Sequence, residues 1–543
     1  MIVDAERVKA WVVDMALLIE QHQDPAAHYY GHFTQEPELA AVLIELIDAL
    51  DEQVIDEDNA YYSACVFALD VCVAQLQSGI ENGNKRALQT MQMVMKSLAA
   101  LIRSNQHTLV FWLPILNIFY DVHAQLSFEL KEAYLDLVHD DEDRSVHQKV
   151  THLNSLQDVI HELADLSVFD MAENFFAQSY AMPADFFADL LVDLYSINEG
   201  AEVGLLSLLH PDTQVRETVL ATLDELMPSI TLSSVALSRL QAIKLWYPSR
   251  YHTRFEHWIK EQRKKGVVFH VKNPAHIMSV RASEVDGGGA QGLFIHMRRG
   301  RDHRLGGLLL KVGFGIKDAW ITPVMKADEV RQYYHDVFDD TVMLRPVDVD
   351  YLQLMVNHFL SITVNKGSMC DLHLLEIQEE TGLQFVPMPL DMASLMDELS
   401  VKISPFTHDV LQAALKSSQA WVKKKSFTDS WYLESAEIDQ LVNRCCSMMD
   451  GVRVCQFSQA TTLLFAEIIE QQRQRWVFHF LWVALWLKAK SRKHETMWRD
   501  SFLIAHAIQT GTPMAEIPIM HDIVQNTIVN SIDTMHERRT HLN

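Results

Sequence analysis

A run of glycines near the middle of the chain is the pattern that most directly suggests chemistry. The segment reads Asp286-Gly287-Gly288-Gly289-Ala290-Gln291-Gly292. Because glycine lets backbone N–H groups approach an anion closely, such a loop can hold a phosphate or a substrate. Phosphate loops normally lead into a helix, whereas the residues after this loop have the pattern of a strand. We therefore favour a tight connection between two strands, with an anion-contacting loop beside Asp286 and Gln291 as the alternative.

Acidic side chains near the glycines offer a second kind of chemistry. Glu284 and Asp286 come at the start of the loop, and Asp318 follows later in the same segment. Two carboxylates that meet can bind a divalent metal ion or act as acid and base. Acidic residues in turns also accept local backbone hydrogen bonds, and that explains these positions without chemistry. We favour the local hydrogen bonds and assign no catalytic residue.

Arginines on either side of this region are the best candidates for contacting phosphate or nucleic acid, since a guanidinium binds phosphate oxygens in pairs. The candidate binding residues are Arg281, Asp286, Gln291, Arg298, Arg299, Arg301 and Arg304. Aromatic side chains that could stack on bases are few, with Phe294 and Phe314 as the available rings. A solvated hairpin tip is the alternative interpretation of the arginines.

Histidine and cysteine do not occur at the spacing of a structural zinc site. The segment 161–165 resembles the start of a HExxH metalloprotease motif, but an aspartate occupies the second histidine position. The thiols of Cys370, Cys445, Cys446 and Cys455 lack paired spacing, so we expect free cysteines buried on helices. We also find no nucleophile elbow and no kinase signature. The sequence therefore predicts no metal and no cofactor.

Charge is distributed unevenly along the chain. The formal net charge is −26, and residues 1–238 alone hold 10 Lys and Arg against 38 Asp and Glu. Residues 239–317 reverse this balance, with 16 Lys and Arg against 5 Asp and Glu, a surplus of +11. Such a basic segment can attract a phosphate-bearing partner or dock on acidic parts of the same chain. The overall negative charge repels nucleic acid at long range, so any such binding must be local and salt-dependent.

The location that we expect is the cytoplasm. The first residues carry acids at Asp4 and Glu6 and lack the basic start and unbroken apolar stretch of a secretory signal. The most apolar runs, 109–120 and 476–487, are about a dozen residues long, whereas a membrane span needs roughly 20. Six cysteines without regular spacing indicate a reducing compartment. We expect no membrane association.

Residues 1 to about 245 have the apolar periodicity of successive amphipathic helices. The segment 205–228 has an apolar helix, then the turn His210-Pro211-Asp212, then a second helix that Val215-Arg216 opens. Pro211 can end the first helix and Asp212 can cap the second. This segment resembles one HEAT repeat, the two-helix unit of an α-solenoid. The resemblance implies a stacked helical architecture of the sort used for binding partners.

After the linker-like segment 246–249 we expect a helix rich in basic residues that ends at Gly266, and β-rich patterns replace the helical ones from residue 267. We predict strands at 267–271, 277–284, 292–298 and 305–312, which form a small antiparallel meander. Helices return from Lys326 onward, and the helix around residues 476–487 is apolar nearly all round, which places it in the C-terminal core. The expected fold is mainly α, a degenerate HEAT-like helical array with a small central antiparallel β segment and a C-terminal helical domain. The expected domains are 1–245, 246–345 and 346–543.

Two hypotheses about function follow from these patterns. The first is a non-enzymatic interaction or scaffold protein that binds a macromolecular partner, with the basic central segment as a surface for anions. A protein partner fits best, and nucleic acid or another polyanion is possible through residues 263–304. The second is an enzyme that acts on a phosphorylated or nucleic-acid substrate, with its site at the central β segment. The lack of a catalytic motif favours the first hypothesis.

Overall fold

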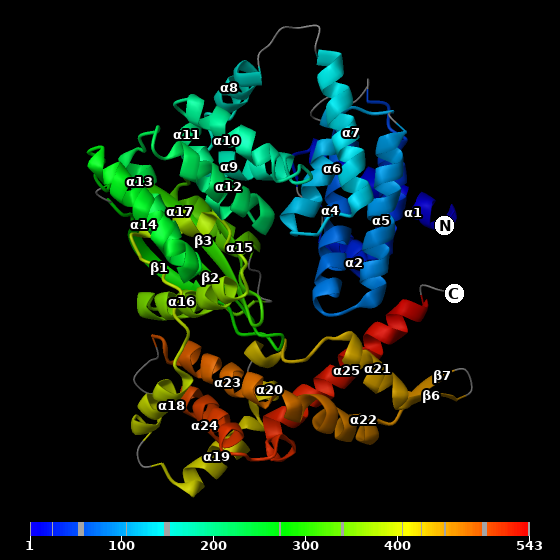
Figure 1. The fold of residues 1–543 in the computed structure, drawn as a ribbon. Helices are drawn as coiled ribbons and strands as arrows, with labels where there is room; N and C mark the ends of the chain where they lie inside the picture. Colours follow the sequence, from blue (N-terminus) through cyan, green and yellow to red (C-terminus); the bar gives the residue numbers. More distant parts are fainter. Residues whose placement is uncertain are drawn as a thin grey trace. The chain divides into compact units, whose positions relative to one another are not determined.

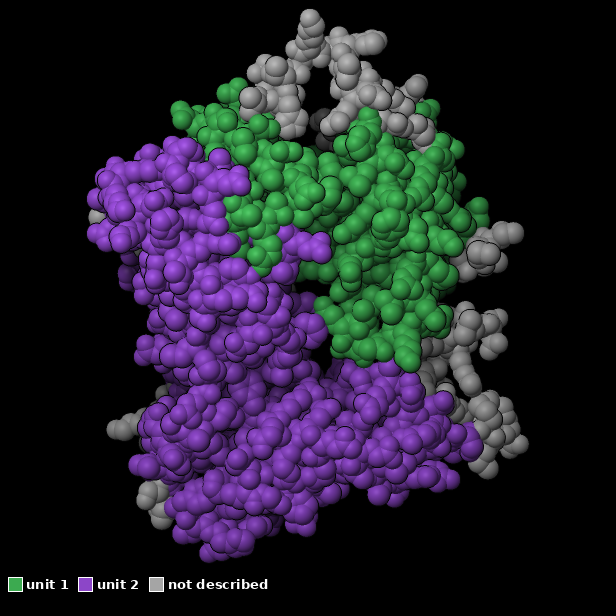
Figure 2. Space-filling model, viewed as in Figure 1, with its two compact units in different colours: residues 1–207, 217–222 green, residues 208–216, 223–543 purple. Residues whose placement is uncertain are grey.

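The computed structural model describes residues 2–540 apart from 24, 26, 53–58, 105, 146–151, 271–272, 338–341, 404–405, 425, 450–451 and 491–496. The chain forms two compact units (Figure 2). The first unit comprises residues 1–207 and 217–222, and the second comprises residues 208–216 and 223–543. Most elements are helices, and a five-stranded antiparallel sheet lies in the second unit (Figure 1). The prediction of a mainly helical fold with a small central antiparallel sheet is confirmed.

The described part of the first unit is helical throughout. Its elements are α1 Ile2–Glu20, α2 Ala27–Gln35, η1 Pro37–Leu39, α3 Ala40–Asp48, α4 Ala60–Glu81, α5 Lys85–Arg103, α6 Leu109–Asp121, α7 Phe128–Ser145, α8 His152–Glu162, α9 Val168–Gln178, α10 Phe186–Ser196 and α11 Gly200–Leu206. Polar side chains cap the start of some of these helices, among them α4, α5 and α9. The Asn59 side chain accepts a hydrogen bond from Tyr62 N, and Asn84 accepts from Arg86 N and Ala87 N. Each cap satisfies amide groups that have no partner within the helix.

Helix α4 is long enough and apolar enough to cross a membrane by length and composition alone. One face of α4, including Cys65, Leu69, Cys72 and Leu76, is buried in the core of the first unit. Helices α1, α3 and α5 pack against α4 in that core. A core helix passes the same length and composition test, and the sequence of α4 therefore carries little weight for a membrane.

The helix–turn–helix predicted at 205–228 is present. Helix α11 continues into η2 Ser207–Leu209, and α12 Thr213–Leu226 follows the turn. Asp212 caps α12, because its carboxylate accepts hydrogen bonds from Gln214 N and Val215 N. Arg216 Nη1 lies 2.7 Å from both His210 O and Pro211 O. The Arg216 side chain thus stabilises the turn that precedes its own helix.

The second unit contains the sheet and the remaining helices. Its elements are α13 Ser234–Trp246, α14 Ser249–Lys264, β1 His276–Ala282, β2 Ala290–Arg299, β3 Asp302–Lys311, β4 Gly315–Ile321, α15 Ala327–Val337, β5 Arg345–Val347, α16 Val349–Asn365, α17 His373–Thr381, α18 Met392–Val401, α19 His408–Ser418, α20 Trp421–Lys424, η3 Ser426–Thr428, α21 Ala436–Arg444, β6 Cys446–Met449, β7 Val452–Cys455, α22 Phe457–Leu464, η4 Phe465–Ile469, η5 Glu470–Gln472, α23 Arg473–Lys488, α24 Met497–Gln509, η6 Met514–Glu516 and α25 Pro518–Thr540. The strand order of the sheet is β4-β3-β2-β1-β5.

The predicted meander is confirmed in three of its four strands, which correspond to β1, β2 and β3. The prediction of a strand at 267–271 is wrong for 267–270, and Val271 lies outside the described residues. This segment follows the end of α14 and pairs with no other strand. His270 N instead donates to Ser238 Oγ and Ser234 O on α13, and Val268 is 68% exposed. A short apolar run without a neighbouring strand cannot complete the hydrogen bonds of a ladder.

One face of the sheet packs on α16 and α17, which contact β4. Leu293, Ile295 and Met297 of β2 are almost fully buried on this inner face, and they alternate with more exposed residues. Ile316 N donates to Thr363 Oγ1 of α16 at 3.0 Å. The period of two along β2 is the pattern of a strand with one buried face, and it determines which side chains point away from the core.

The C-terminal helices surround α23. Every side chain from Trp476 to Leu487 except Phe478 is buried, which confirms the prediction that this helix is central to the core. The apolar run that precedes it is not one regular helix. It passes from α22 through the π-helix η4 and the short 3-10 helix η5 before α23 begins. Ser501 Oγ of α24 donates to Phe480 O and ties the two helices together.

A disulfide joins Cys446 and Cys455, whose Cα atoms lie 3.9 Å apart. The two residues are opposite each other in the β6–β7 hairpin. The prediction of free cysteines on helices is therefore wrong for this pair, because the sequence did not reveal the hairpin that brings them together. Among the described residues, Cys65, Cys72, Cys370 and Cys445 are free and buried.

The two compact units do not coincide with the three expected domains, 1–245, 246–345 and 346–543. Helices α13 and α14 belong to the same unit as the sheet, and so do α16 and α17, which follow residue 345. A compact unit can contain more than one domain. The three-domain division stays a prediction.

Candidate binding site on the central sheet

The glycine loop is a tight connection between β1 and β2. Gly287 N donates to Ser430 O at 3.0 Å, and Gly289 N donates to Asp286 O at 3.0 Å. A Cβ atom added to Gly287 would lie 2.3 Å from Tyr432 O, so only glycine fits against that backbone. Gly289 has φ +80°, which again favours glycine. Two of the three successive glycine amides are thus used within the protein, as the connection interpretation predicts and an anion loop does not.

Asp286 serves this turn. Its Oδ1 atom accepts a hydrogen bond from Ala290 N at 2.7 Å. Burial raises the pKa of the carboxyl group, while the amides of Ala290 and Gly289 and the charges of Lys311 and Arg475 lower it. The Arg475 guanidinium also donates to Gly287 O at 2.9 Å. Asp286 therefore acts as a local acceptor that shapes the turn.

Gln291 lies in the core and not at a surface. Its side chain is 1% exposed, and its Nε2 atom donates to Ser283 O at 2.8 Å. Its Oε1 atom accepts from the Tyr351 hydroxyl at 2.6 Å and from Trp482 Nε1 at 3.1 Å. These contacts link the sheet to α16 and α23 through groups that would otherwise be buried without partners. The contacts of Gln291 are those of a structural residue.

The five arginines of the candidate site are divided between the two faces of the sheet. Residues that stand opposite each other in antiparallel strands point to the same side, and neighbours along one strand point to opposite sides. Arg281 pairs with Phe294, and Arg298 pairs with His303, which places Arg281 and Arg298 on the face away from α16 and α17. We call this the outer face. Arg299 and Arg304 belong to the inner face, and Arg301 lies in the two-residue turn between β2 and β3.

Acidic residues of α17 bind the inner-face arginines. Arg304 Nη2 lies 2.9 Å from Glu376 Oε1, and Arg304 Nη1 lies 3.5 Å from Glu380 Oε1. Arg299 Nη2 lies 2.9 Å from Glu380 Oε2. In addition, Arg239 of α13 forms a two-point ion pair with Glu379 of the same helix. Part of the basic surplus of residues 239–317 is therefore neutralised by α17.

The outer-face arginines have different surroundings. Arg281 and Arg298 are exposed. The Arg281 guanidinium lies 4.5 Å from the centre of the Tyr334 ring of α15, which is a cation–π distance. No carboxylate among the described residues forms an ion pair with Arg281, Arg298 or Arg301. These three side chains keep positive charge that the described part of the unit does not neutralise.

Aromatic rings that the sequence did not place here lie on the same outer face. Phe294 pairs with Arg281, and Trp320 pairs with Gly307 across β3 and β4. The ring centres of Phe294 and Trp320 are 6.3 Å apart, and Trp320 is 5.9 Å from Tyr333 of α15. Phe294 was identified from the sequence as an available ring, whereas Trp320 was not, because β4 and α15 were not assigned to this surface. A period-two alignment of 315–321 with β3 would have found it.

Two histidines also lie on the outer face, which α15 covers in part where it packs on β3. His296 Nε2 and His303 Nδ1 are 2.8 Å apart, so one ring donates a hydrogen bond to the other. Burial, His303 and the nearby arginines Arg281 and Arg298 all lower the pKa of His296. His296 is therefore neutral at physiological pH and adds no positive charge to this face.

The predicted constellation of Asp286, Gln291 and arginines is not assembled at one place. Ala290, next to the turn of Asp286, pairs with Lys311, whereas Arg299 pairs with Asp302 at the other end of the hairpin. Nine residue steps along a strand span roughly 30 Å. Asp286 and Arg301 therefore lie at opposite ends of β2 and β3. The described geometry separates Asp286 from the arginines of the β2–β3 hairpin, whereas Arg475 lies beside its turn.

The Cys370 and His373 side chains also have separate roles. Burial raises the pKa of the Cys370 thiol to about 12. His373 Nδ1 lies 3.1 Å from Asp371 Oδ1, at the start of α17. Among the described residues, Cys370 belongs to no group of three side chains that could share a metal ion.

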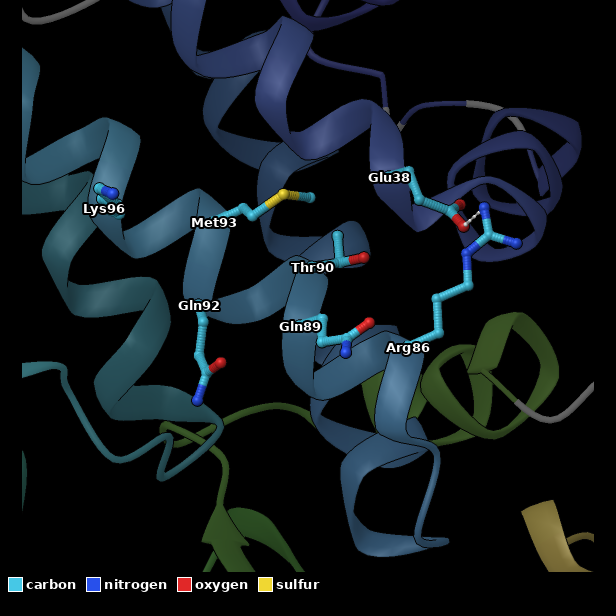
Figure 3. A pocket seen from close by; sticks show the side chains of 7 residues that line it. All are labelled: Glu38, Arg86, Gln89, Thr90, Gln92, Met93 and Lys96. Atoms are coloured by element: carbon cyan, nitrogen blue, oxygen red, sulfur yellow. Dashed lines mark ion pairs between the residues drawn. The ribbon is translucent and has the colours of Figure 1, made fainter.

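A depression of about 550 Å³ lies on the first unit, along α5 (Figure 3). Its lining residues are Glu38, Arg86, Gln89, Thr90, Gln92, Met93 and Lys96. Arg86 and Glu38 form an ion pair of 2.7 Å across it, and both side chains are exposed. All the lining residues except Thr90 are surface residues. The depression offers no converging buried polar groups and carries no chemistry of its own.

Three successive segments of the chain are similar to known sequence families. Residues 183–266 match the family model described as the Y4lR second domain, residues 272–381 match a domain of unknown function (DUF7401), and residues 393–532 match the Y4lR C-terminal helical domain. The middle match runs from β1 to α17, so it includes the sheet and both helices on its inner face. The matches contain no HEAT-repeat family, and that resemblance stays an expectation.

A curated relative agrees with these matches. The uncharacterized protein y4lR of Sinorhizobium fredii (strain NBRC 101917 / NGR234) is 25% identical over 368 residues. The similarity covers 63% of this chain and 68% of the relative. No solved structure matches the chain. The similarity thus relates the chain to y4lR, a protein described as uncharacterized.

Proposed function

We propose that this protein is a non-enzymatic interaction protein whose outer sheet face contacts an anionic partner. The helices form the scaffold, and the central sheet presents the contact surface. The observation that carries the proposal is the difference between two sets of arginines on one sheet. Arg299 and Arg304 form ion pairs with α17, whereas Arg281 and Arg298 point away from it and form no ion pair with any described carboxylate.

Electrostatics supports this choice of surface. An exposed guanidinium that has no carboxylate partner attracts an external anion more strongly than one that is already neutralised. Arg281 is also held in place by its contact with the Tyr334 ring. A side chain that is held in this way loses less conformational entropy when it binds a ligand. The outer face therefore offers both unneutralised charge and partial pre-organisation.

The helical part of the proposal extends the local helix–turn–helix at α11 and α12 to a degenerate HEAT-like array. Such arrays are used to bind macromolecules along stacked helices, and a protein partner in the cytoplasm is the expected case. The support is the cap at Asp212 and the buried Arg216 turn contact. This part of the proposal rests on a resemblance over one unit.

An enzyme acting through Asp286, Gln291 and the arginines has weaker support. Gln291 is occupied in the core, and Asp286 lies far along the hairpin from Arg301. The hypothesis of an enzyme with other catalytic residues stays a prediction, and no site is assigned to it. We therefore retain the interaction protein as the function that the geometry favours.

Retention of the purified full-length chain on immobilised heparin tests the proposal, because heparin is a polyanion without bases. The double variant Arg281→Ala, Arg298→Ala should elute at clearly lower salt than the wild type. The matched variant Arg299→Ala, which removes a charge from the inner face, should elute close to the wild type. Equal effects of both variants, or no retention of the wild type, would count against the outer face as the anion-contacting surface.

A further inference from the structure

The aromatic rings of the outer face are not explained by anion binding alone. Phe294 and Trp320 are half-buried and lie on the same surface as Arg281 and Arg298. A Cβ atom at Gly307 would lie 2.2 Å from Trp320 Cε2, and one at Gly292 would lie 2.9 Å from Phe294 Cζ. The Trp320 ring thus lies over Gly307 of the neighbouring strand, and the Phe294 ring lies over Gly292 of its own strand. In these positions each ring lies along the sheet surface.

Rings that lie along a sheet surface, with arginines beside Phe294, form a platform on which flat groups can stack. Phe294, His296 and Arg298 alternate along β2 on the outer face, with successive side chains about 7 Å apart. Arg281 of β1 pairs with Phe294, so a guanidinium lies beside the ring. The surface therefore combines ring faces for stacking with guanidinium groups for phosphates.

We propose that the outer face binds single-stranded nucleic acid, with bases stacked on Phe294 and Trp320 and phosphates bound by Arg281 and Arg298. This inference rests on the proposed anion-contacting role of the same face. An acidic peptide would satisfy the arginines but has no flat groups for the rings, whereas every base has a π face. A regular duplex hides its base faces, so the rings favour a single strand.

The charge of the whole chain sets the character of this binding. The net charge of −26 repels a polyanion, but at physiological ionic strength this repulsion is largely screened beyond about 8 Å, so binding depends on the local charge of the outer face. Asp318 is also on the outer face, at the β4 edge, and this places the positive region on β1 and β2. Affinity should therefore fall steeply with salt, with a slope in log units of about −0.7 for each phosphate contacted.

The test is fluorescence anisotropy of a labelled thymidine oligonucleotide of about 20 residues, titrated with the full-length chain. We expect Arg298→Ala to weaken binding severalfold and Phe294→Leu to weaken it by at least about fivefold, the usual cost of losing one stacked base. Phe294→Tyr keeps the ring and should bind like the wild type. Arg299→Ala is the matched control on the other face and should also bind like the wild type.

Heparin retention separates this inference from the proposed function. Phe294→Leu should elute from heparin with the wild type, because heparin has no bases to stack. The nucleic-acid inference fails if the oligonucleotide does not bind, if Phe294→Leu binds it as well as the wild type, or if a polyglutamate peptide or a duplex binds more tightly. If these failures occur while heparin retention still depends on Arg281 and Arg298, the anion-contacting function stands. If neither ligand depends on Arg298, both proposals fail.

Discussion

Arg298 and Arg299 are neighbours in sequence and lie on opposite faces of the central sheet. Arg299 forms an ion pair of 2.9 Å with Glu380 of α17, whereas Arg298 stands opposite His303 on the outer face and is exposed. Arginine is thus ion-paired with a helix at one position and exposed on the other face at the next. The period of two along β2 produces this difference. It also provides a matched pair of positions for experiment.

The ion pairs of α17 should differ in their contribution to stability. Glu376 is almost fully buried, so Arg304→Ala leaves a buried carboxylate without its guanidinium and should lower the free energy of unfolding by about 3 kcal/mol. Arg299 is exposed, so Arg299→Ala should cost at most about 1 kcal/mol. Chemical denaturation of both variants measures the difference. Equal small losses would show that Glu376 is not held by Arg304.

The Gln291 network should be essential to the second unit. Gln291→Leu removes an acceptor that Tyr351 and Trp482 both use and should destabilise the fold by roughly 2–4 kcal/mol. Gln419→Ala changes an exposed glutamine in the same unit and should cost well under about 1 kcal/mol. Thermal unfolding followed by tryptophan fluorescence reports both. A Gln291→Leu variant as stable as the wild type would contradict the buried network.

Adjacent glycines of the loop should respond differently to alanine. Gly287→Ala places a methyl group 2.3 Å from Tyr432 O and should destabilise the chain by about 1–3 kcal/mol or prevent folding. Gly288 is exposed, and the nearest atom to an added methyl group is the Asp286 side chain at 3.2 Å. Gly288→Ala should therefore be much milder. If heparin retention drops in Gly288→Ala while its unfolding midpoint is unchanged, the loop itself contacts anions.

Two buried histidines, His210 and His479, and the half-buried His358 should make stability depend on pH. Burial is the largest cause that lowers the pKa of His210 and His479 to about 3, and burial lowers the pKa of His358 to about 4. These groups are neutral in the folded state but take up protons in the unfolded state below pH 6.5. The contribution of these histidines to stability should be fully present above pH 6.5 and should fall as the pH decreases toward 4. The loss between pH 6.5 and 5 should be at most about 2 kcal/mol per histidine.

Urea unfolding midpoints at pH 7 and pH 5 measure this dependence. His358 Nδ1 accepts a hydrogen bond from Leu390 N, and the amide oxygen of glutamine can replace that acceptor. His358→Gln should therefore fold and show a smaller loss between pH 7 and pH 5 than the wild type. Identical midpoints at the two pH values would mean that these histidines do not titrate as neutral buried groups.

The sequence was sufficient to predict the β2–β3 hairpin, because alternating apolar residues flank a turn that contains Gly300. It also predicted the central position of α23 from its unbroken apolar run. It could not show that Arg299 and Arg304 bind α17, since their partners lie about 80 residues away along the chain. Long-range pairing depends on how the helix docks on the sheet, and no local pattern encodes that geometry.

The outer face illustrates the same limit. Phe294 and Arg281 were each visible in the sequence, but their pairing depends on the β1–β2 register, which contains a bulge between Ile277 and Ser279. A shift of one residue would move both side chains to the inner face. The position of Trp320 on this surface follows from the pairing of β4 with β3. The composition of the site therefore required the register of the strands.

The most direct test of the central claim is chemical modification of arginines with phenylglyoxal, read by mass spectrometry of peptides, with and without a saturating polyanion. This experiment uses the wild-type chain and measures which guanidinium groups the bound ligand protects. Bound heparin or oligonucleotide should slow the modification of Arg281 and Arg298 and leave the rate at Arg299 unchanged. Protection of Arg299 without protection of Arg298, or no protection of either, would contradict the outer face as the binding surface.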